Sequence, residues 1–273
     1  MLKQICNMTK LQLKNIYGIN VYRFTKDKKE KKKKTALIFV YAFLIVLAAF
    51  YAGGMAYGYI FMGLSELLPA YLIMLSSLII LFFSVFKAES IIFQRNAYDI
   101  LVSLPITQTA IVVSRFIRMY VENMLLTFVI MLPPMAVYGI MIKPGISFYI
   151  IGILVTIFIP LLPITISIFL GALITAIASR MKHKSLASTV LSIVLILGIL
   201  VGFSKVAVME DEFSIEMMQS LLGTMLGIIE GIYPPAVWLG NAMLTGDFLA
   251  CVACVAGSLL LFFIVMAVVS ISR

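Results

Sequence analysis

Six long apolar stretches constrain the fold of this chain more than any other feature. They lie near residues 36–61, 67–87, 110–140, 147–178, 187–207 and 248–271. A helix of about 20 residues crosses a hydrocarbon core of about 30 Å. With 63% hydrophobic and 12% charged residues, the chain could not keep the surface of a soluble domain polar. Because the stretches lack the alternation of membrane strands, we predict an all-α, polytopic membrane protein with six transmembrane helices.

Basic residues are distributed unevenly among the loops between these stretches. Successive loops alternate between the two sides of the membrane. Nineteen of the 21 lysines and arginines fall on one of these sides, and only Lys143 and Lys205 fall on the other. Cytoplasmic loops of membrane proteins carry such an excess of positive charge. The pattern therefore predicts a multi-pass protein of the cell membrane with both termini in the cytoplasm.

The chain divides into two predicted regions, residues 1–35 and 36–273. Within the first, residues 2–17 read as an amphipathic helix that lies in the membrane interface. A basic run follows at the membrane surface, where orientation of the first span and binding of anionic membrane lipid account for its charge, so no nucleic acid partner is expected. The lysines of this run are Lys28, Lys29, Lys31, Lys32, Lys33 and Lys34. The second region is the predicted six-helix transmembrane domain.

The segment 88–109 is the only sizeable predicted cytoplasmic loop between spans. Asp99 can cap a short helix over residues 100–104, and Pro105 ends that helix. Apolar side chains on a wet loop, such as Leu101 and Leu104, need a partner surface. That surface is either another protein or the cytoplasmic base of this chain itself.

Three ionisable residues, Arg115, Arg118 and Glu122, lie within about two turns at the start of the third span. Arg118 and Glu122 have the i,i+4 spacing that allows an ion pair. Charged groups at this depth are costly and are often functional. The alternative is that the paired carboxylate only holds the helices together.

Prolines are expected to kink the third and fourth spans, at Pro133-Pro134 and at Pro160 and Pro163 respectively. The carbonyl oxygens that lose a donor there must bond to neighbours or water. In the first span, the G-x-x-x-G motif from Gly54 to Gly58 predicts a close helix-packing face.

The segment 208–247 is the longest predicted extracytoplasmic part of the chain. It is expected to contain an amphipathic helix at or in the outer leaflet, ended by Gly231, Pro234 and Pro235. Trp238 follows as an anchor at the membrane interface.

The sequence lacks the common catalytic patterns. It contains no G-x-x-x-x-G-K-[ST] phosphate loop, no H-E-x-x-H and no G-x-S-x-G, and it has a single histidine. Cys251 and Cys254 lie inside an apolar span and are interpreted as packing residues rather than metal ligands. We therefore expect no enzyme activity, cofactor or metal site in this chain.

Several segments resemble the permease subunits of type-2 bacterial ABC exporters, in particular a poorly characterised Gram-positive group. They are Phe93-Gln-Arg-Asn-Ala-Tyr-Asp-Ile-Leu-Val-Ser-Leu-Pro-Ile, Ile111-Val-Val-Ser-Arg-Phe, Met131-Leu-Pro-Pro and Tyr138-Gly-Ile, with Leu11-Gln-Leu-Lys-Asn-Ile-Tyr-Gly-Ile-Asn near the start. The resemblance implies a permease of the bacterial cytoplasmic membrane that moves a substrate outward with ATP hydrolysed by a separate ATPase subunit. It also implies that the loop couples to that ATPase, through Tyr98, Asp99, Ile100, Leu101, Leu104 and Pro105.

Relatives with this resemblance often contain a second set of spans, whereas this chain stops after the sixth. It is therefore expected to be a half-permease that pairs with a second permease half or forms a homodimer, or else a fragment of a two-half protein. Two other functions are open on sequence alone. One is a membrane scaffold or sensor that transports nothing, and the other is an ion-coupled secondary transporter with Glu122 as the coupling acid. The sequence does not indicate a substrate.

Overall fold

The computed structural model describes residues 2–16, 28–92, 108–178 and 215–271, together with four single residues between 190 and 197. Every regular element formed by these residues is an α-helix. The helices are α1 (Leu2–Ile16), α3 (Lys28–Phe61), α4 (Leu67–Ile92), α6 (Gln108–Ile142), α7 (Ile146–Phe158), α8 (Leu161–Ala178), α10 (Ile215–Ile232), α11 (Pro234–Thr245) and α12 (Phe248–Ile271). The all-α prediction holds for this part of the chain.

Five stretches in the described residues are long and apolar enough to cross a membrane. They are Thr35–Phe61, Leu67–Val85, Ala110–Ile142, Ile146–Ile174 and Phe248–Val265. They match the predicted spans closely, because a run of about 20 apolar residues leaves little choice of boundary. The other predicted span, 187–207, lies largely outside the described residues. Membrane association is therefore supported, while the number of six spans and the sidedness of the termini stay predictions.

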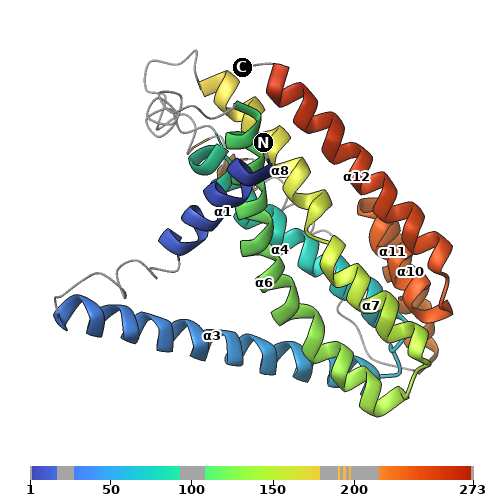
Figure 1. Ribbon diagram of the computed structural model, residues 1–273. Coiled ribbons are helices and arrows are strands. Elements are labelled where there is room, and N and C mark those ends of the chain that lie inside the picture. The colour runs from blue at the N-terminus through green and yellow to red at the C-terminus, as the bar shows by residue number, and fades with distance from the viewer. Residues whose placement is uncertain are drawn as a thin grey trace.

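The core of the molecule forms around α4, which contacts α6, α8, α10 and α11. These helices lie side by side in a bundle, with α12 along one side of it (Figure 1). The largest fully buried side chains are Leu67, Leu68, Ile73, Ile80, Ile111, Met119, Met131, Ile151, Ile164, Ile168 and Met243. One end of the bundle contains the α3–α4 turn and the α6–α7 turn (Figure 1). It is called the lysine-poor end, because these turns belong to the side that the sequence predicts to carry few basic residues. The opposite end contains α1 and the last turns of α12 (Figure 1).

Helix α3 leaves the bundle near its Phe61 end and extends away from it, so that its Lys28 end lies apart from the other helices (Figure 1). Its main contact is with α6. Large side chains along it are exposed, for example Phe39 and Phe50. An apolar helix with so little protein around it is suited to lipid, since lipid tails solvate such side chains.

The G-x-x-x-G motif of α3 does not lie at a helix contact within the described residues. Among them, no atom outside the local helix lies within 4 Å of a Cβ built on Gly54 or Gly58. The face of α3 that meets α6 contains instead Gly53, which lies against Pro133 and Val137, and the fully buried Ala56. Small residues do form the contact of α3 with α6, but they lie on a different face of α3 from Gly54 and Gly58.

The two pairs of prolines have different effects. Helix α6 continues through Pro133 and Pro134, so this pair does not interrupt the third span. The fourth span is interrupted, because α7 ends at Phe158 and α8 begins at Leu161. Beside this interruption, the hydroxyl of Tyr120 on α6 donates a hydrogen bond to the carbonyl oxygen of Ile157. A neighbouring helix therefore supplies a donor, as the sequence predicts for a break in a membrane helix.

The segment after α10 contains a second helix that the sequence analysis missed. Helix α10 ends at Ile232, as Gly231 and Pro234 predict, but the two prolines then form the first turn of α11, where a missing N–H costs nothing. Helix α11 packs against α4 at a crossing where Gly240 lies on the backbone of Ala70. Trp238 is exposed on α11, in keeping with an interface anchor.

Candidate functional site

Glu122 on α6 is the centre of a charged cluster with Lys87 and Arg118. One carboxylate oxygen accepts from the Lys87 ammonium, with 2.8 Å between Nζ and Oε2, and the other accepts from Arg118, with 3.1 Å between Nε and Oε1. The side chain of Glu122 is only 12% exposed, whereas those of Lys87 and Arg118 are 39% and 29% exposed. The three groups thus form a compact cluster with two cations and one carboxylate, at the edge of the bundle.

A second polar link lies one turn deeper between the same two helices. The side-chain amide of Asn123 donates to the Ser84 hydroxyl at 3.0 Å and to the Met119 carbonyl oxygen at 2.9 Å. Both Asn123 and Ser84 are buried. Since Ser84 and Lys87 lie on one face of α4, and Glu122 and Asn123 are adjacent on α6, the two links fix the register of these helices.

Helix α1 packs on the first turns of α6, at the same end of the bundle as the charged cluster (Figure 1). Its buried residues there are Met8 and Thr9, and the Gln12 amide lies 3.4 Å from the Ser114 hydroxyl. The next residue, Arg115, is almost fully buried. The predicted amphipathic helix therefore exists as α1, but part of its face is occupied by α6 instead of lipid.

The residues predicted to be functional separate into three groups. Arg118 and Glu122 form the ion pair that their i,i+4 spacing allows, and Arg115 lies on the same helix. The lysine run forms the first turns of α3, where Lys29, Lys32 and Lys33 are exposed. The loop residues Tyr98, Asp99, Ile100, Leu101, Leu104 and Pro105 lie outside the described residues.

Lys87, Ser84 and Asn123 are members of this site that sequence reasoning missed. Lys87 and Ser84 lie near the end of an apolar run that reads simply as a membrane span. A signal was present, because Ser84 and Lys87 have an i,i+3 spacing and so lie on one helix face. The sequence does not show which neighbouring helix that face meets, and this kept the link to Glu122 hidden.

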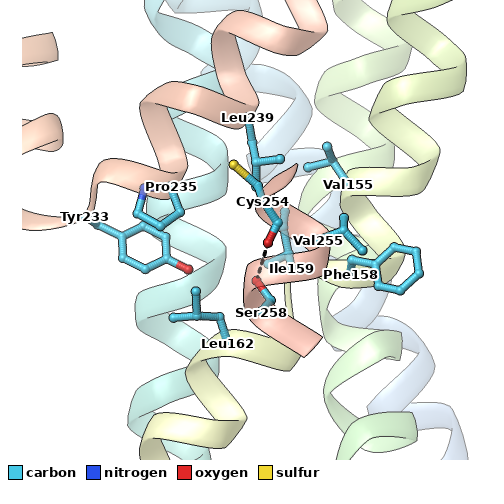
Figure 2. A pocket seen from close by; sticks show the side chains of 10 residues that line it. All are labelled: Val155, Phe158, Ile159, Leu162, Tyr233, Pro235, Leu239, Cys254, Val255 and Ser258. Carbon is cyan, nitrogen blue, oxygen red and sulfur yellow. Dashed lines mark hydrogen bonds between the residues drawn. The ribbon is translucent and has the colours of Figure 1, made fainter. Parts of the chain in front are cut away.

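A small cavity lies where the interruption between α7 and α8 faces α11 and α12 (Figure 2). Its space for the centre of a water molecule is about 10 Å³, enough for one water at most. The lining is largely apolar, and the polar groups on it belong to Tyr233, Cys254 and Ser258. The Ser258 hydroxyl is turned to the Cys254 carbonyl oxygen of its own helix, at 2.9 Å (Figure 2). Burial raises the pKa of the Tyr233 phenol above its ordinary value.

Comparison with known proteins identifies a family for the chain. A family model described as "Putative ATP-binding cassette" matches residues 28–272, which is nearly the whole chain. No curated protein and no solved structure matches the chain. The matched range contains all the apolar helices and the charged cluster, and of the described helices it omits only α1.

This match overturns three expectations from the sequence. The assignment to the permease subunits of ABC exporters is wrong, because the matching family is described as an ATP-binding cassette. The predicted permease function, and the expectation that the chain binds no nucleotide and is no enzyme, are contradicted by the same finding. The error arose because the assignment relied on segments that resemble permeases, and a resemblance of this kind does not determine which chemistry a chain performs.

The described residues near the cavity do not fit a nucleotide. The cavity is too small and its lining too apolar for a triphosphate. No step of ATP chemistry is therefore assigned to the residues that line it.

Proposed function

This chain belongs to the ATP-binding cassette family matched above, and we propose that it works in a membrane as part of an ABC transporter, together with other subunits. The observation that carries the proposal is the coincidence of the family match with the apolar helices, because the matched residues 28–272 include all five candidate spans. ATP is bound within this assembly.

The position of the charged cluster along α4 and α6 supports a membrane location. About 20 helical residues cross a hydrocarbon core. Counting about 20 residues along α6 from Ile142, at the lysine-poor end, reaches Glu122, and the same count along α4 from Leu67 reaches Lys87. The cluster would therefore lie at the boundary between hydrocarbon and headgroups, where charged side chains are tolerated.

The predicted loop of segment 88–109 is proposed as the contact with another subunit; its first residues belong to α4 and its last to α6, which leaves 93–107 between these helices. The support is its composition, since Ile100, Leu101 and Leu104 are apolar residues that need a covering surface if this segment lies in water. Replacing both Leu101 and Leu104 by Asp is expected to release the other subunit while this chain stays in the membrane. Ser103→Asp adds charge to the same segment and serves as the control that should keep the subunit bound.

The main experiment is purification of the tagged chain from membranes, followed by labelling with a photoreactive ATP analogue and measurement of ATP hydrolysis in lipid nanodiscs. Labelling of this chain, competed by ATP, would support ATP binding by its own residues. Labelling confined to a subunit that purifies with it would leave the transporter assembly intact and move ATP binding to that subunit. Absence of labelling and of any such subunit in folded protein would contradict the proposal.

A further inference from the structure

We propose that Arg118, at the edge of the charged cluster, binds the phosphate group of an anionic phospholipid. The inference needs the membrane location proposed above, but it does not depend on any role in an ABC transporter. It starts from how the Arg118 guanidinium is used. Within the described part of the chain, the single bond from its Nε to Glu122 is its only polar contact. Both terminal amino groups are left for a partner from outside the protein.

The free edge of the guanidinium suits a phosphate. Its N–H groups form a planar fork that donates two parallel hydrogen bonds to phosphate or carboxylate oxygens. The side chain is 29% exposed, so the fork is reachable from outside the bundle. Glu122 holds the Nε side of the same group at 3.1 Å and thereby restricts its rotation. A guanidinium oriented in advance loses less freedom when it binds.

The charge of the cluster favours an anion. Arg118 shares the single carboxylate of Glu122 with Lys87, so this carboxylate compensates the positive charge of Arg118 only in part. The lipid that complements the remaining positive charge is one whose headgroup is itself negative. Basic pockets between membrane helices are known to bind anionic headgroups in this way.

The depth of Arg118 matches the level of lipid phosphates. If Glu122 lies at the boundary of the hydrocarbon core, Arg118 lies four residues further out, which is about 6 Å along the helix. The headgroup layer extends about 5–7 Å beyond the core on each side. Helix α1 crosses the first turns of α6 just beyond this level, through the Gln12–Ser114 contact. The exposed Leu11 of α1 adds an apolar side chain suited to the same interface.

The test is native mass spectrometry of the full chain in detergent, titrated with dioleoyl phosphatidylglycerol or with dioleoyl phosphatidylcholine. The wild type is expected to retain one phosphatidylglycerol with clear preference over phosphatidylcholine. Arg118→Gln should weaken that binding about tenfold, since it removes a bidentate charge-assisted contact. Arg118→Lys keeps the charge without the fork and should show a smaller loss. Lys10→Gln removes an exposed charge from α1 and should change the affinity less than about twofold.

Several results would overturn the inference. Equal affinity of the wild type for the two lipids would remove the charge argument, and equal losses in Arg118→Gln and Lys10→Gln would show diffuse attraction rather than a site. Inorganic phosphate is added in a further arm, and displacement of phosphatidylglycerol by millimolar phosphate would show that the site takes a free anion. If Arg118→Gln fails to give a monodisperse protein, Arg118→Lys is compared with the wild type instead. Unchanged phosphatidylglycerol binding in Arg118→Lys would refute the proposed contact of the planar guanidinium with the phosphate. None of these readouts uses ATP, so they stand apart from the test of the transporter role.

Discussion

The hydroxyl of Tyr120 donates to the carbonyl oxygen of Ile157 across the contact between α6 and α7, with 2.6 Å between the two oxygen atoms. The acceptor lies in the last turn of α7, next to the place where Pro160 and Pro163 remove two backbone donors. A carbonyl oxygen in hydrocarbon without a donor costs free energy, and this bond relieves part of that cost.

Tyr120→Phe removes the donor and keeps the ring. The free energy of unfolding is expected to fall by about 1 kcal/mol, because the Ile157 carbonyl then has no side-chain partner. Thermal unfolding of the detergent-solubilised protein measures the change. Tyr41→Phe, at an exposed position on α3, is the matched control. Equal stability of the two variants would show that the bond carries no weight.

Glu122→Gln leaves two cations next to each other without a counter-charge. We expect a loss of about 1–2 kcal/mol, less than for a fully buried ion pair, because Lys87 and Arg118 are partly exposed. The loss should shrink when Lys87→Met is added, since one of the repelling charges is then gone. Glu66→Gln removes an exposed carboxylate at the other end and should have little effect. Additive losses in the double variant would contradict the coupling of these groups.

Gly240→Ala is expected to destabilise the bundle by about 1–3 kcal/mol. A Cβ at this position would lie 2.8 Å from the Ala70 nitrogen and 2.9 Å from its Cα, and backbone atoms cannot move aside as a side chain can. Gly257→Ala on α12 provides the contrast, because among the described residues no atom outside the local helix lies within 4 Å of a Cβ built there. That variant should be neutral or slightly stabilised, as alanine favours helix. Equal melting temperatures of Gly240→Ala and Gly257→Ala would refute the close contact of α11 with α4.

Lys143→Gly should raise the stability by up to about 1 kcal/mol. Lys143 lies in the turn between α6 and α7 with φ of 52°, a left-handed conformation that is costly for a residue with a Cβ. Lys143→Ala removes the same charge but keeps the Cβ, so it should give no gain. If both variants were stabilised alike, the charge rather than the backbone conformation would be the cause.

Much of the fold follows from local features of the sequence. The start of α4 at Leu67 and the extent of α12 from Phe248 to Ile271 were predicted because each apolar run is bounded by polar or glycine residues. The existence of α1 and the Arg118–Glu122 pair followed from helical spacing, which is also local.

The features that were missed depend on which helices meet. The sequence does not show that Gly240 would face Ala70, or that Lys87 would reach Glu122 from another helix. Helix α11 was missed for a different reason: Pro234 and Pro235 were interpreted as an end, although proline is equally compatible with a first turn. The predicted link to an ABC system is supported by the family match, but it came from resembling segments. Apolar patterning could not give it, since the same patterning serves any protein that lies in a membrane.

The interruption between α7 and α8 has a consequence for how this span enters the membrane. Neither helix is long enough alone: α7 has 13 residues and α8 has 18, about 20 Å and 27 Å of helix. During biosynthesis the segment 146–174 therefore has to partition into lipid as one continuous apolar stretch. Its bent shape gains further stability when α6 supplies the Tyr120 hydroxyl to the Ile157 carbonyl oxygen. We therefore expect the bend to become more favourable once α6 lies beside this span in the membrane.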